Sequence, residues 1–361
     1  MRPSSVSLAA ALALLPLPAL AGMPGLDALE PGWNRLAPGG DTGCAPGTPF
    51  HFSVRPGAED RLLVFLNGGG ACWSAGLCDL ETEPSPYVPI ADLPHNDPQT
   101  LGGVFRLDHP ENPLADWSMV FISYCTGDVH LGTRIDGYSG EDGAQITAQH
   151  RGRANAMAAL DWALGAFDAP ERVMVAGSSA GALGAPFFAA MLADAWPEAL
   201  LIALGDGAGG YRTGPMSVVY DAWGMLDDLP DWPELADVTS DSFVFDDFWR
   251  IARARHPNMV MAQFNNAHDA VQVQFLRLLG IGDPVYPLLN ANLDELAQTV
   301  PGFTHYMAGG EVHTILRSDN VYAYAQNGER FVDWLATLAG GSAPDMVTCG
   351  SAEDCAEEPL P

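Results

Sequence analysis

The chain has 361 residues with 45 acidic and 16 basic side chains, a formal net charge of −29, and no lysine, since every basic residue is arginine. The absence of lysine excludes a Walker A phosphate loop, a pyridoxal Schiff base and a Ser–Lys dyad, because each needs an ammonium group. The acidity argues against nucleic acid as a partner, since binding phosphates takes a basic patch. Hydrophobic residues make up 48% of the chain, which is enough for a large buried core.

The first 21 residues have the features of a secretory signal peptide. Arg2 precedes the apolar stretch Val6–Leu15, and the sequence Ala-Leu-Ala at positions 19–21 forms a small-x-small cleavage site. This stretch is too short to span a bilayer, and no later stretch reaches the ~18 uninterrupted apolar residues that a span requires. We therefore expect a signal peptide over residues 1–21, a secreted or periplasmic protein, and no membrane span.

The chain contains six cysteines, and an even number in an oxidising compartment favours disulfides. Two pairs each enclose five residues, which suits small closed loops, and the remaining two cysteines then pair by elimination. The expected disulfides are Cys72–Cys78, Cys349–Cys355 and Cys44–Cys125. Zinc is the alternative, but the usual C-x2-C spacing and the HExxH pattern are both absent, so we expect no bound metal.

Short apolar runs predict buried strands, and helical stretches lie between several of them. The expected strands are Arg61–Leu66, Ser118–Ser123, Arg172–Ala176, Leu200–Leu204, Met259–Phe264 and Phe303–Met307. The expected helices are residues 146–167, 180–196 and 269–280, the last with Val271, Phe275, Leu278 and Leu279 on one face. Strands that alternate with helices predict a single α/β domain, over residues 22–340, whose mostly parallel sheet is covered on both faces.

Two segments lie outside this alternation. Residues 225–247 hold many aspartates with Trp232, Phe243 and Phe245 among them, and we interpret this segment as a cap or insertion over the sheet edge. The aspartates lack the spacing of an EF-hand calcium loop, so a solvated acidic surface is favoured. Residues 341–361 form an acidic tail that its cysteine pair closes into a loop.

The most informative motif is Gly177-Ser178-Ser179-Ala180-Gly181, a G-x-S-x-G between an apolar β-branched run and an alanine-rich helical run. This setting is typical of a nucleophile elbow. Glycines are needed because a side chain two residues from the nucleophile would collide with the neighbouring strand or helix. Ser179 would then lie at a helix N-terminus, where the dipole favours developing negative charge. Ser178 is the displaced alternative, but only Ser179 has glycine two positions before and after it.

A second glycine element, residues 67–70, follows the strand expected at 61–66 and has the sequence Asn-Gly-Gly-Gly. In hydrolases with an elbow, the oxyanion hole combines the N–H after the nucleophile with one from such a loop. These donors would be Ala180 with Gly69 and Gly70. A phosphate-binding loop is the alternative, but it would need a lysine or an acidic ribose partner that the sequence lacks.

An elbow of this kind is followed along the chain by an acid and then a histidine. His313 lies in a loop past the last expected strand, whereas His305 lies within that strand and is interpreted as a core residue. For the acid, Asp269 and Asp206 both follow expected strands. Chain order alone therefore leaves both aspartates open.

Five segments, LNGGGACW, SYCTGDVHLG, GSSAGALGA, FNNAHDAVQ and VHTIL, occur in this order between about Cys44 and Leu316. Together they resemble the pectin acetylesterase/Notum family of α/β-hydrolase-fold carboxylesterases. The resemblance implies Ser179 as nucleophile, Asp269 as acid and His313 as base. The implied oxyanion N–H groups are those of Gly69, Gly70 and Ala180. The family often has a bulky aromatic residue where this chain has Gly70, a difference that leaves the backbone donor intact.

The position in the sheet also favours Asp269. It follows the second strand after the nucleophile strand, the usual place of the acid in the α/β-hydrolase fold. Asp206 follows the first, in a glycine tract that suits bracing the elbow or shaping the cleft.

We therefore expect a secreted, monomeric serine carboxylesterase that needs no cofactor and acts on O-acyl esters, with acylated polysaccharide as one candidate substrate. A polyester depolymerase or lipase would use the same residues, and a catalytically silent saccharide-binding protein would keep the fold. Members of the family remove acetyl groups from pectin or a fatty acyl group from a secreted signalling protein, and the motifs do not choose between these substrates. The negative charge would repel bare polygalacturonate unless ions screen it.

Overall fold

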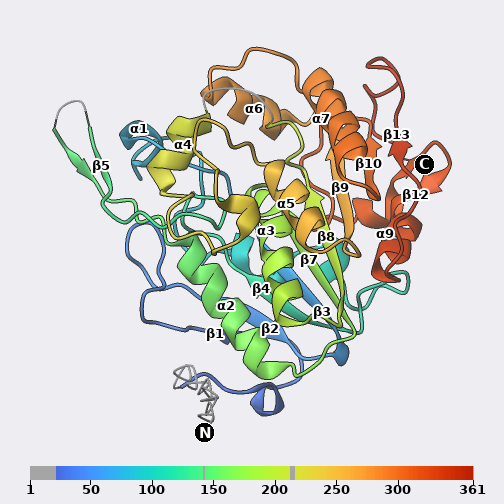
Figure 1. The fold of residues 1–361 in the computed structure, drawn as a ribbon, viewed down its shortest axis with the longest axis horizontal. Helices are drawn as coiled ribbons and strands as arrows, with labels where there is room; N and C mark the ends of the chain where they lie inside the picture. The colour runs from blue at the N-terminus through green and yellow to red at the C-terminus, as the bar shows by residue number, and fades with distance from the viewer. Residues whose placement is uncertain (1–21, 141–142, 212–215, 361) are drawn as a thin grey trace, which may run out of the picture.

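The structure, a computed structural model, describes residues 22–140, 143–211 and 216–360, so the expected signal peptide lies outside the described residues. A nine-stranded sheet forms its centre (Figure 1). In spatial order the strands are β1 (Asn34–Leu36), β2 (Phe52–Arg55), β4 (Trp117–Ile122), β3 (Ala58–Leu66), β7 (Arg172–Ser178), β8 (Leu200–Asp206), β9 (Val260–Asn266), β10 (Phe303–Ala308) and β13 (Val347–Thr348). Neighbours from β4 to β13 are parallel, whereas β1–β2 and β2–β4 are antiparallel.

Helices cover both faces of this sheet (Figure 1). The helices are α1 (Ala75–Cys78), α2 (Gly152–Ala166), α3 (Ala180–Ala195), α4 (Met216–Trp223), α5 (Asp247–Arg255), α6 (Ala270–Leu278), α7 (Val285–Thr299), α8 (Asn320–Ala323) and α9 (Phe331–Ala339). Short hairpins pair β5 (Tyr138–Ser139) with β6 (Gln145–Ile146) and β11 (Ala325–Gln326) with β12 (Glu329–Arg330).

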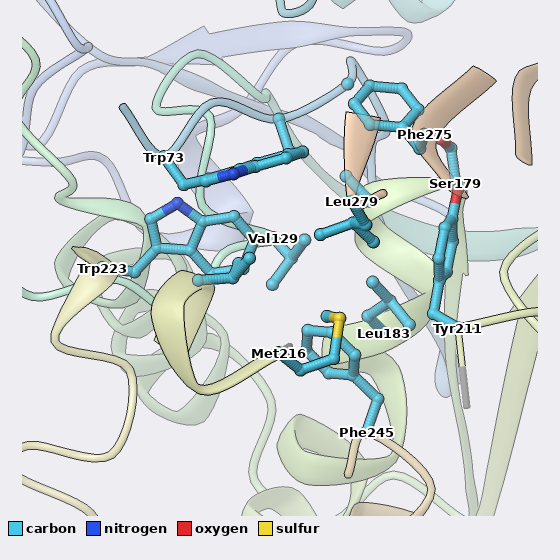
Figure 2. A pocket seen from close by; sticks show the side chains of 14 residues that line it. Trp73, Val129, Ser179, Leu183, Tyr211, Met216, Trp223, Phe245, Phe275 and Leu279 are labelled. Atoms are coloured by element: carbon cyan, nitrogen blue, oxygen red, sulfur yellow. The ribbon is translucent and has the colours of Figure 1, made fainter. Parts of the chain in front are cut away.

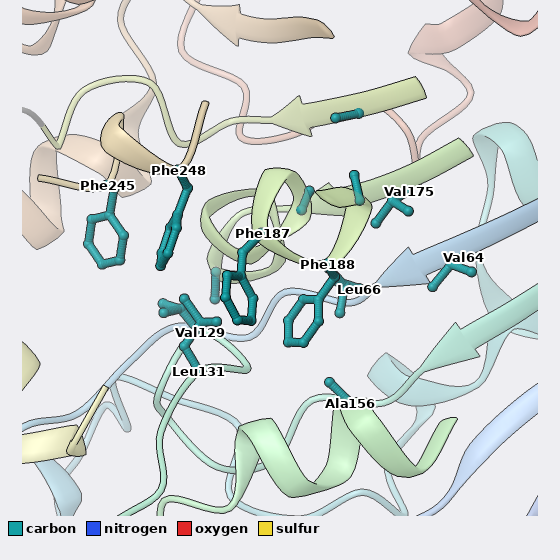
Figure 3. Close-up of a cluster of buried hydrophobic side chains, with 14 of the residues drawn as sticks. Val64, Leu66, Val129, Leu131, Ala156, Val175, Phe187, Phe188, Phe245 and Phe248 are labelled. Carbon is teal, nitrogen blue, oxygen red and sulfur yellow. The ribbon is translucent and has the colours of Figure 1, made fainter. Parts of the chain in front are cut away.

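The two layers follow from the alternation of side chains along each strand. In β3, Val64 and Leu66 belong to the core that α2, α3, α5 and α7 cover, whereas Leu63 and Phe65 belong to the core under α8 and α9. Figure 3 shows Phe188 of α3 between the sheet and α2. Because the central strands are apolar on both sides, the expectation of a mostly parallel sheet with helices on both faces is confirmed.

The six expected strands all occur, with ends that differ by up to three residues. The expected helix at 146–167 was wrong at its start, because Gln145–Ile146 pairs with β5 and α2 begins only at Gly152. The expected apolar face of α6 is confirmed only in part, since Phe275 and Leu279 pack against the core. Leu276 is buried in the core, whereas Leu278 is 40% exposed.

Residues 225–247 pack their aromatic side chains against α3. The ring of Phe187 in α3 lies 5.5 Å from Trp232 and 5.1 Å from Phe248 at the start of α5. Figure 3 shows Phe187, Phe245 and Phe248 around this contact. The aspartates of the segment, such as Asp231 and Asp237, are mostly exposed. The segment therefore lies over one face of the sheet with its charges in solvent.

Three disulfides join Cys44 to Cys125, Cys72 to Cys78 and Cys349 to Cys355, the pairs expected from the sequence. The first ties the segment before β2 to the loop after β4, and the second closes a loop between the glycine element and α1. No helix within the described ranges combines the length and hydrophobicity needed to cross a membrane.

We predict that the Cys44–Cys125 bond stabilises the fold more than the Cys349–Cys355 bond does. The bonded cysteines are 81 and 6 residues apart, and the chain-entropy account gives about 4–5 kcal/mol for the longer loop against about 2 for the shorter. Urea unfolding of the C44A/C125A and C349A/C355A variants measures both. Equal losses in the free energy of unfolding would contradict the prediction.

Candidate functional site

The turn from β7 to α3 holds Ser179 in a strained conformation. Its φ is 55° and its ψ −122°, values that a residue with a side chain rarely adopts. A Cβ on Gly177 would lie 2.2 Å from the carbonyl oxygen of Gly181, and one on Gly181 would lie 2.0 Å from that of Leu66. Strand and helix therefore approach each other only because both flanking positions are glycine. The turn presents Ser179 at the N-terminus of α3.

Ser178, the displaced alternative, points the other way. Its side chain is fully buried, and its hydroxyl donates a 2.7 Å hydrogen bond to Oδ2 of Asp206 at the end of β8. Ser179, in contrast, lines a pocket. Of the two serines, only Ser179 therefore faces a space that a substrate could enter.

The glycine element after β3 is fixed through its carbonyl groups. The bonds are Asn67 O to His130 Nε2 (2.8 Å), Gly68 O to His95 Nε2 (2.6 Å), Gly69 O to Val88 N (2.8 Å) and Gly70 O to the Tyr124 hydroxyl (2.9 Å). Gly70 has φ +73°, and a Cβ there would lie 1.9 Å from the Pro86 carbonyl oxygen. The loop is therefore held by donors that lie outside it.

Three backbone N–H groups beside Ser179, two in the glycine element and one at the start of α3, donate to no backbone acceptor among the described residues. They belong to Gly69, Gly70 and Ala180. Ala180 is the first residue of α3, where the N–H has no partner inside the helix. Gly70 and Ala180 both line the pocket that Ser179 faces. These groups can therefore donate to an oxygen bound beside Ser179.

His313 and Asp269 are in direct contact. Nδ1 of His313 lies 2.8 Å from Oδ2 of Asp269, whose side chain is fully buried. Asp269 caps α6, since its Oδ1 accepts from the backbone N–H groups of Val271 and Gln272 at 3.0 and 2.9 Å. The side chain of Gln272 donates to Oδ2 at 3.0 Å. The carboxylate is thus oriented by three donors besides the imidazole, and Nε2 of His313 is buried without a hydrogen-bond partner among the described residues.

Asp206, the rival acid, does not contact the imidazole through a hydrogen bond in the described structure. Its carboxylate accepts from Ser178 and from the backbone N–H groups of Ile315 and Leu316. Burial raises the pKa of Asp206 above its usual value, and the hydrogen bonds from Leu316, Ser178 and Ile315 oppose that rise. Asp269 therefore contacts the ring of His313, whereas Asp206 contacts the backbone that follows His313 in the chain.

A pocket with an almost wholly apolar lining opens beside Ser179 (Figure 2). Its walls include Trp73, Val129, Leu183, Trp223, Phe275 and Leu279. The indole N–H of Trp223 donates to the Cys72 carbonyl at 2.7 Å, so the ring presents carbon atoms to the space. Tyr211 also lines the pocket, and burial together with the nearby Asp269 raises the pKa of its hydroxyl. The pocket therefore suits a ligand whose polar group lies at Ser179 and whose attached apolar group contacts the apolar side chains.

Among the described residues, one cluster has ligand atoms close enough for a metal ion, formed by Cys72, Cys78 and His150. The two cysteines are bonded to each other, so neither offers a thiolate. His150 is hydrogen-bonded at both nitrogens, to the Tyr138 hydroxyl and the Thr126 carbonyl. This cluster is a structural unit and not a metal site.

The fold and the elbow define the class of protein, an α/β-hydrolase-fold carboxylic ester hydrolase. Residues 39–212, just under half of the chain, match the model of the family described as Pectinacetylesterase. The matched segment contains Ser179 and the glycine element and ends before Asp269 and His313. The resemblance seen in the sequence is thereby confirmed.

Solved structures of the Wnt deacylase Notum from Drosophila share the fold. One crystal form has a TM-score of 0.60 at 16% identity and covers 87% of this chain and 95% of that one. A second has a TM-score of 0.61 at 16% identity and covers 90% and 100%. No curated protein sequence matches the chain.

Sequence reasoning missed the side chains that hold the site together. Tyr124 accepts from the N–H of Val129 and donates to Gly70, while the guanidinium of Arg317 donates to Oδ1 of Asn67 at 2.7 Å. Tyr124 lies in one of the motifs that the family shares, but nothing in the motif assigns it a role. Arg317 is 250 residues from its partner, so only the fold reveals the contact.

We predict that the protein loses stability as pH falls from about 6.5 to 4. Burial lowers the pKa of His51, His130 and His305 to about 4, whereas the unfolded chain takes up these protons near pH 6.5. Because the unfolded state binds more protons in this interval, each imidazole favours folding above it. For the fully buried His130 the loss is on the order of 3 kcal/mol.

Urea unfolding at pH 7 and pH 4.5 measures this effect. His130→Gln removes one buried imidazole and should reduce the difference in unfolding free energy between the two pH values, with His109→Gln, at a partly exposed ring, as the control for the substitution itself. If the free energy of unfolding changed equally with pH in wild type and His130→Gln, the lowered pKa of His130 would not be the cause.

Proposed function

We propose that the chain is a secreted or periplasmic serine esterase that hydrolyses O-acyl esters, with Ser179 as nucleophile, His313 as base and Asp269 as acid. The observation that carries the proposal is the 2.8 Å contact between Asp269 and His313 at the same edge of the sheet as the strained Ser179. The three residues follow β7, β9 and β10, which are parallel and close together in the sheet. Parallel strands bring the loops at their carboxyl ends to one edge.

In the proposed reaction, neutral His313 takes the hydroxyl proton of Ser179 through Nε2 as Ser179 Oγ attacks the ester carbonyl. Asp269 accepts the Nδ1–H bond, which fixes the tautomer and stabilises the imidazolium. The tetrahedral intermediate collapses when the imidazolium returns its proton to the leaving alcohol. Water then attacks the acyl-enzyme by the same route and releases the carboxylic acid. The residues supply all proton transfers, so this route uses no metal or organic cofactor.

The oxyanion of each tetrahedral intermediate would lie against the N–H groups of Gly69, Gly70 and Ala180. A donor of this kind typically contributes a ~10²–10³-fold rate effect. The fixed carbonyl groups of the glycine element support this role, because the N–H groups need not reorganise when charge develops. The dipole of α3 adds a favourable field at its N-terminus.

The pocket lining points to the acyl side of the substrate. Gly70 and Ala180 line the pocket with Ser179, and the other lining residues are mostly apolar. We therefore assign the acyl group to this pocket, with the alcohol part, such as an acylated polysaccharide, outside it. The apolar lining also favours the second candidate, a lipase or polyester depolymerase.

Secretion is supported by the three disulfides and by the expected signal peptide. The monomeric state remains a prediction that size-exclusion chromatography with light scattering can test.

We predict that Ser179→Ala abolishes ester hydrolysis and labelling by a fluorophosphonate probe. Asp269→Asn should lower kcat by about 10⁴-fold with little change in the free energy of unfolding, because an amide favours the wrong imidazole tautomer. The exposed Ser242→Ala is the matched serine control and should behave as wild type. Stoichiometric labelling of Ser179→Ala would disprove the assignment, and a wild-type protein that takes up no label would indicate a silent binding protein.

We predict that Leu183→Trp shortens the acyl pocket and lowers kcat/KM for octanoyl esters by at least ~10-fold while sparing acetyl esters, since one missing contact in an apolar pocket is worth about 1–3 kcal/mol. p-Nitrophenyl esters of increasing chain length give the measurement. Leu164→Trp, on the exposed side of α2, serves as the control for adding a tryptophan. Equal effects on acetyl and octanoyl esters would place the acyl group elsewhere.

A further inference from the structure

The mechanism above gives no task to Asp206, a buried carboxylate beside the elbow. Asp206 ends β8, and its side chain is fully buried. Oδ2 accepts the Ser178 hydroxyl at 2.7 Å and the Leu316 N–H at 3.0 Å, while Oδ1 accepts the Ile315 N–H at 3.0 Å. The backbone oxygen of Asp206 accepts the N–H of Ser179 at 2.7 Å. One residue thus contacts the elbow through two bonds and the segment after His313 through two more.

The segment after His313 is strained where Asp206 holds it. Thr314 has φ +64°, which is unusual for a β-branched residue. Such a conformation persists only where the surroundings fix it. The turn at Thr314 lies between the imidazole of His313, which bonds Asp269, and the two N–H groups that bond Asp206. The strain is therefore fixed from both sides by carboxylates.

Only an acceptor can fill this place. The three donors around the Asp206 side chain are one hydroxyl and two backbone N–H groups, and an ionised carboxylate accepts without donating. An amide would direct its own N–H groups toward at least one of them. Burial lowers the pKa of the Arg317 guanidinium, next along the same segment, and the Asp206 charge opposes that lowering. The site therefore selects an aspartate by both hydrogen bonding and charge.

We infer that Asp206 is a positioning residue that sets the separation of Ser179 and His313 by holding the elbow and the histidine segment on one carboxylate. The inference rests on the proposed function, because it assigns a task to those two residues. Asp206 takes no part in proton transfer. It holds Ser179 through its backbone oxygen and Ser178, and His313 through Ile315 and Leu316.

The first test is Asp206→Asn, with p-nitrophenyl acetate as substrate at a temperature well below the melting temperature of each variant. We expect kcat to fall ~10–100-fold with KM nearly unchanged, because misplacement of reacting groups by about 1 Å costs this much. The rate of fluorophosphonate labelling should fall in parallel. A variant that keeps the wild-type kcat and labelling rate would overturn the inference.

The pH profile separates positioning from a purely structural role. Asp269 bonds the imidazole, the Asp206 charge interacts with it, and Arg317 interacts in turn with Asp206, while Glu311, two residues before His313, is exposed. Removing the Asp206 charge disfavours the imidazolium, so the acid limb of kcat/KM should move to lower pH. Asp246→Asn, at another buried carboxylate that accepts from Asn292, is the matched control and should leave the acid limb in place. An acid limb unchanged in Asp206→Asn would count against the inference.

Ser178→Ala is a second test of the inference, which can be used if Asp206→Asn fails to fold. It removes only the bond from the elbow, so kcat should fall by less than in Asp206→Asn and the acid limb should stay. The double variant should lose less activity than the two single losses combined, because both substitutions act on the same hydrogen-bond network. Wild-type kcat in Ser178→Ala, or strictly additive losses, would overturn the inference. Activity in Ser179→Ala would instead overturn the proposed function.

Discussion

The close approach of α3 to β7 and β3 is the constraint on which the site depends. Carbonyl oxygens stand about 2 Å from where a Cβ would lie on Gly177 and on Gly181, so the turn closes only with glycine at both positions. That closure forces Ser179 into a backbone conformation of high energy and leaves its side chain directed into the pocket. It also starts α3 directly at the nucleophile, so that the N–H of Ala180 has no acceptor within the helix. A steric condition on two glycines thereby creates both the exposed hydroxyl and an oxyanion donor.

The glycine element is held in place by hydrogen bonds, because buried backbone groups need hydrogen-bond partners. Each carbonyl from Asn67 to Gly70 is taken by a donor outside the loop, and two of these donors are histidine Nε2 atoms. A carbonyl only accepts, so each of these imidazoles must carry its proton on Nε2. Burial keeps His130 neutral by lowering its pKa to about 4. The loop is therefore rigid on its carbonyl side, which leaves its N–H side ready for an anion.

The sequence predicted those parts that depend on local pattern. The elbow, the glycine element and the strands they follow were all readable because each needs certain residues at fixed spacing. The antiparallel edge formed by β1 and β2 was missed, since both strands are short and β2 joins the sheet only through β4. The contacts of Tyr124 and Arg317, and those of Asp206 with the segment after His313, were not predictable, because the partners are up to 250 residues away. Likewise, no pattern marks the positive φ of Val129 or Thr314, which only tertiary packing sustains.

The order of the strands explains why a positioning carboxylate is needed at β8. Ser179 follows β7, Asp206 follows β8, Asp269 follows β9, and His313 follows β10, so consecutive strands deliver the four residues in order. Neighbouring strands are about 4.8 Å apart, which puts β10 roughly 14 Å from β7. The histidine segment must cross this distance over the strands between. Asp206 at the end of β8 and Asp269 in the turn after β9 both hold the segment by hydrogen bonds, so a carboxylate from each intermediate strand or its following turn supports it on the way to Ser179.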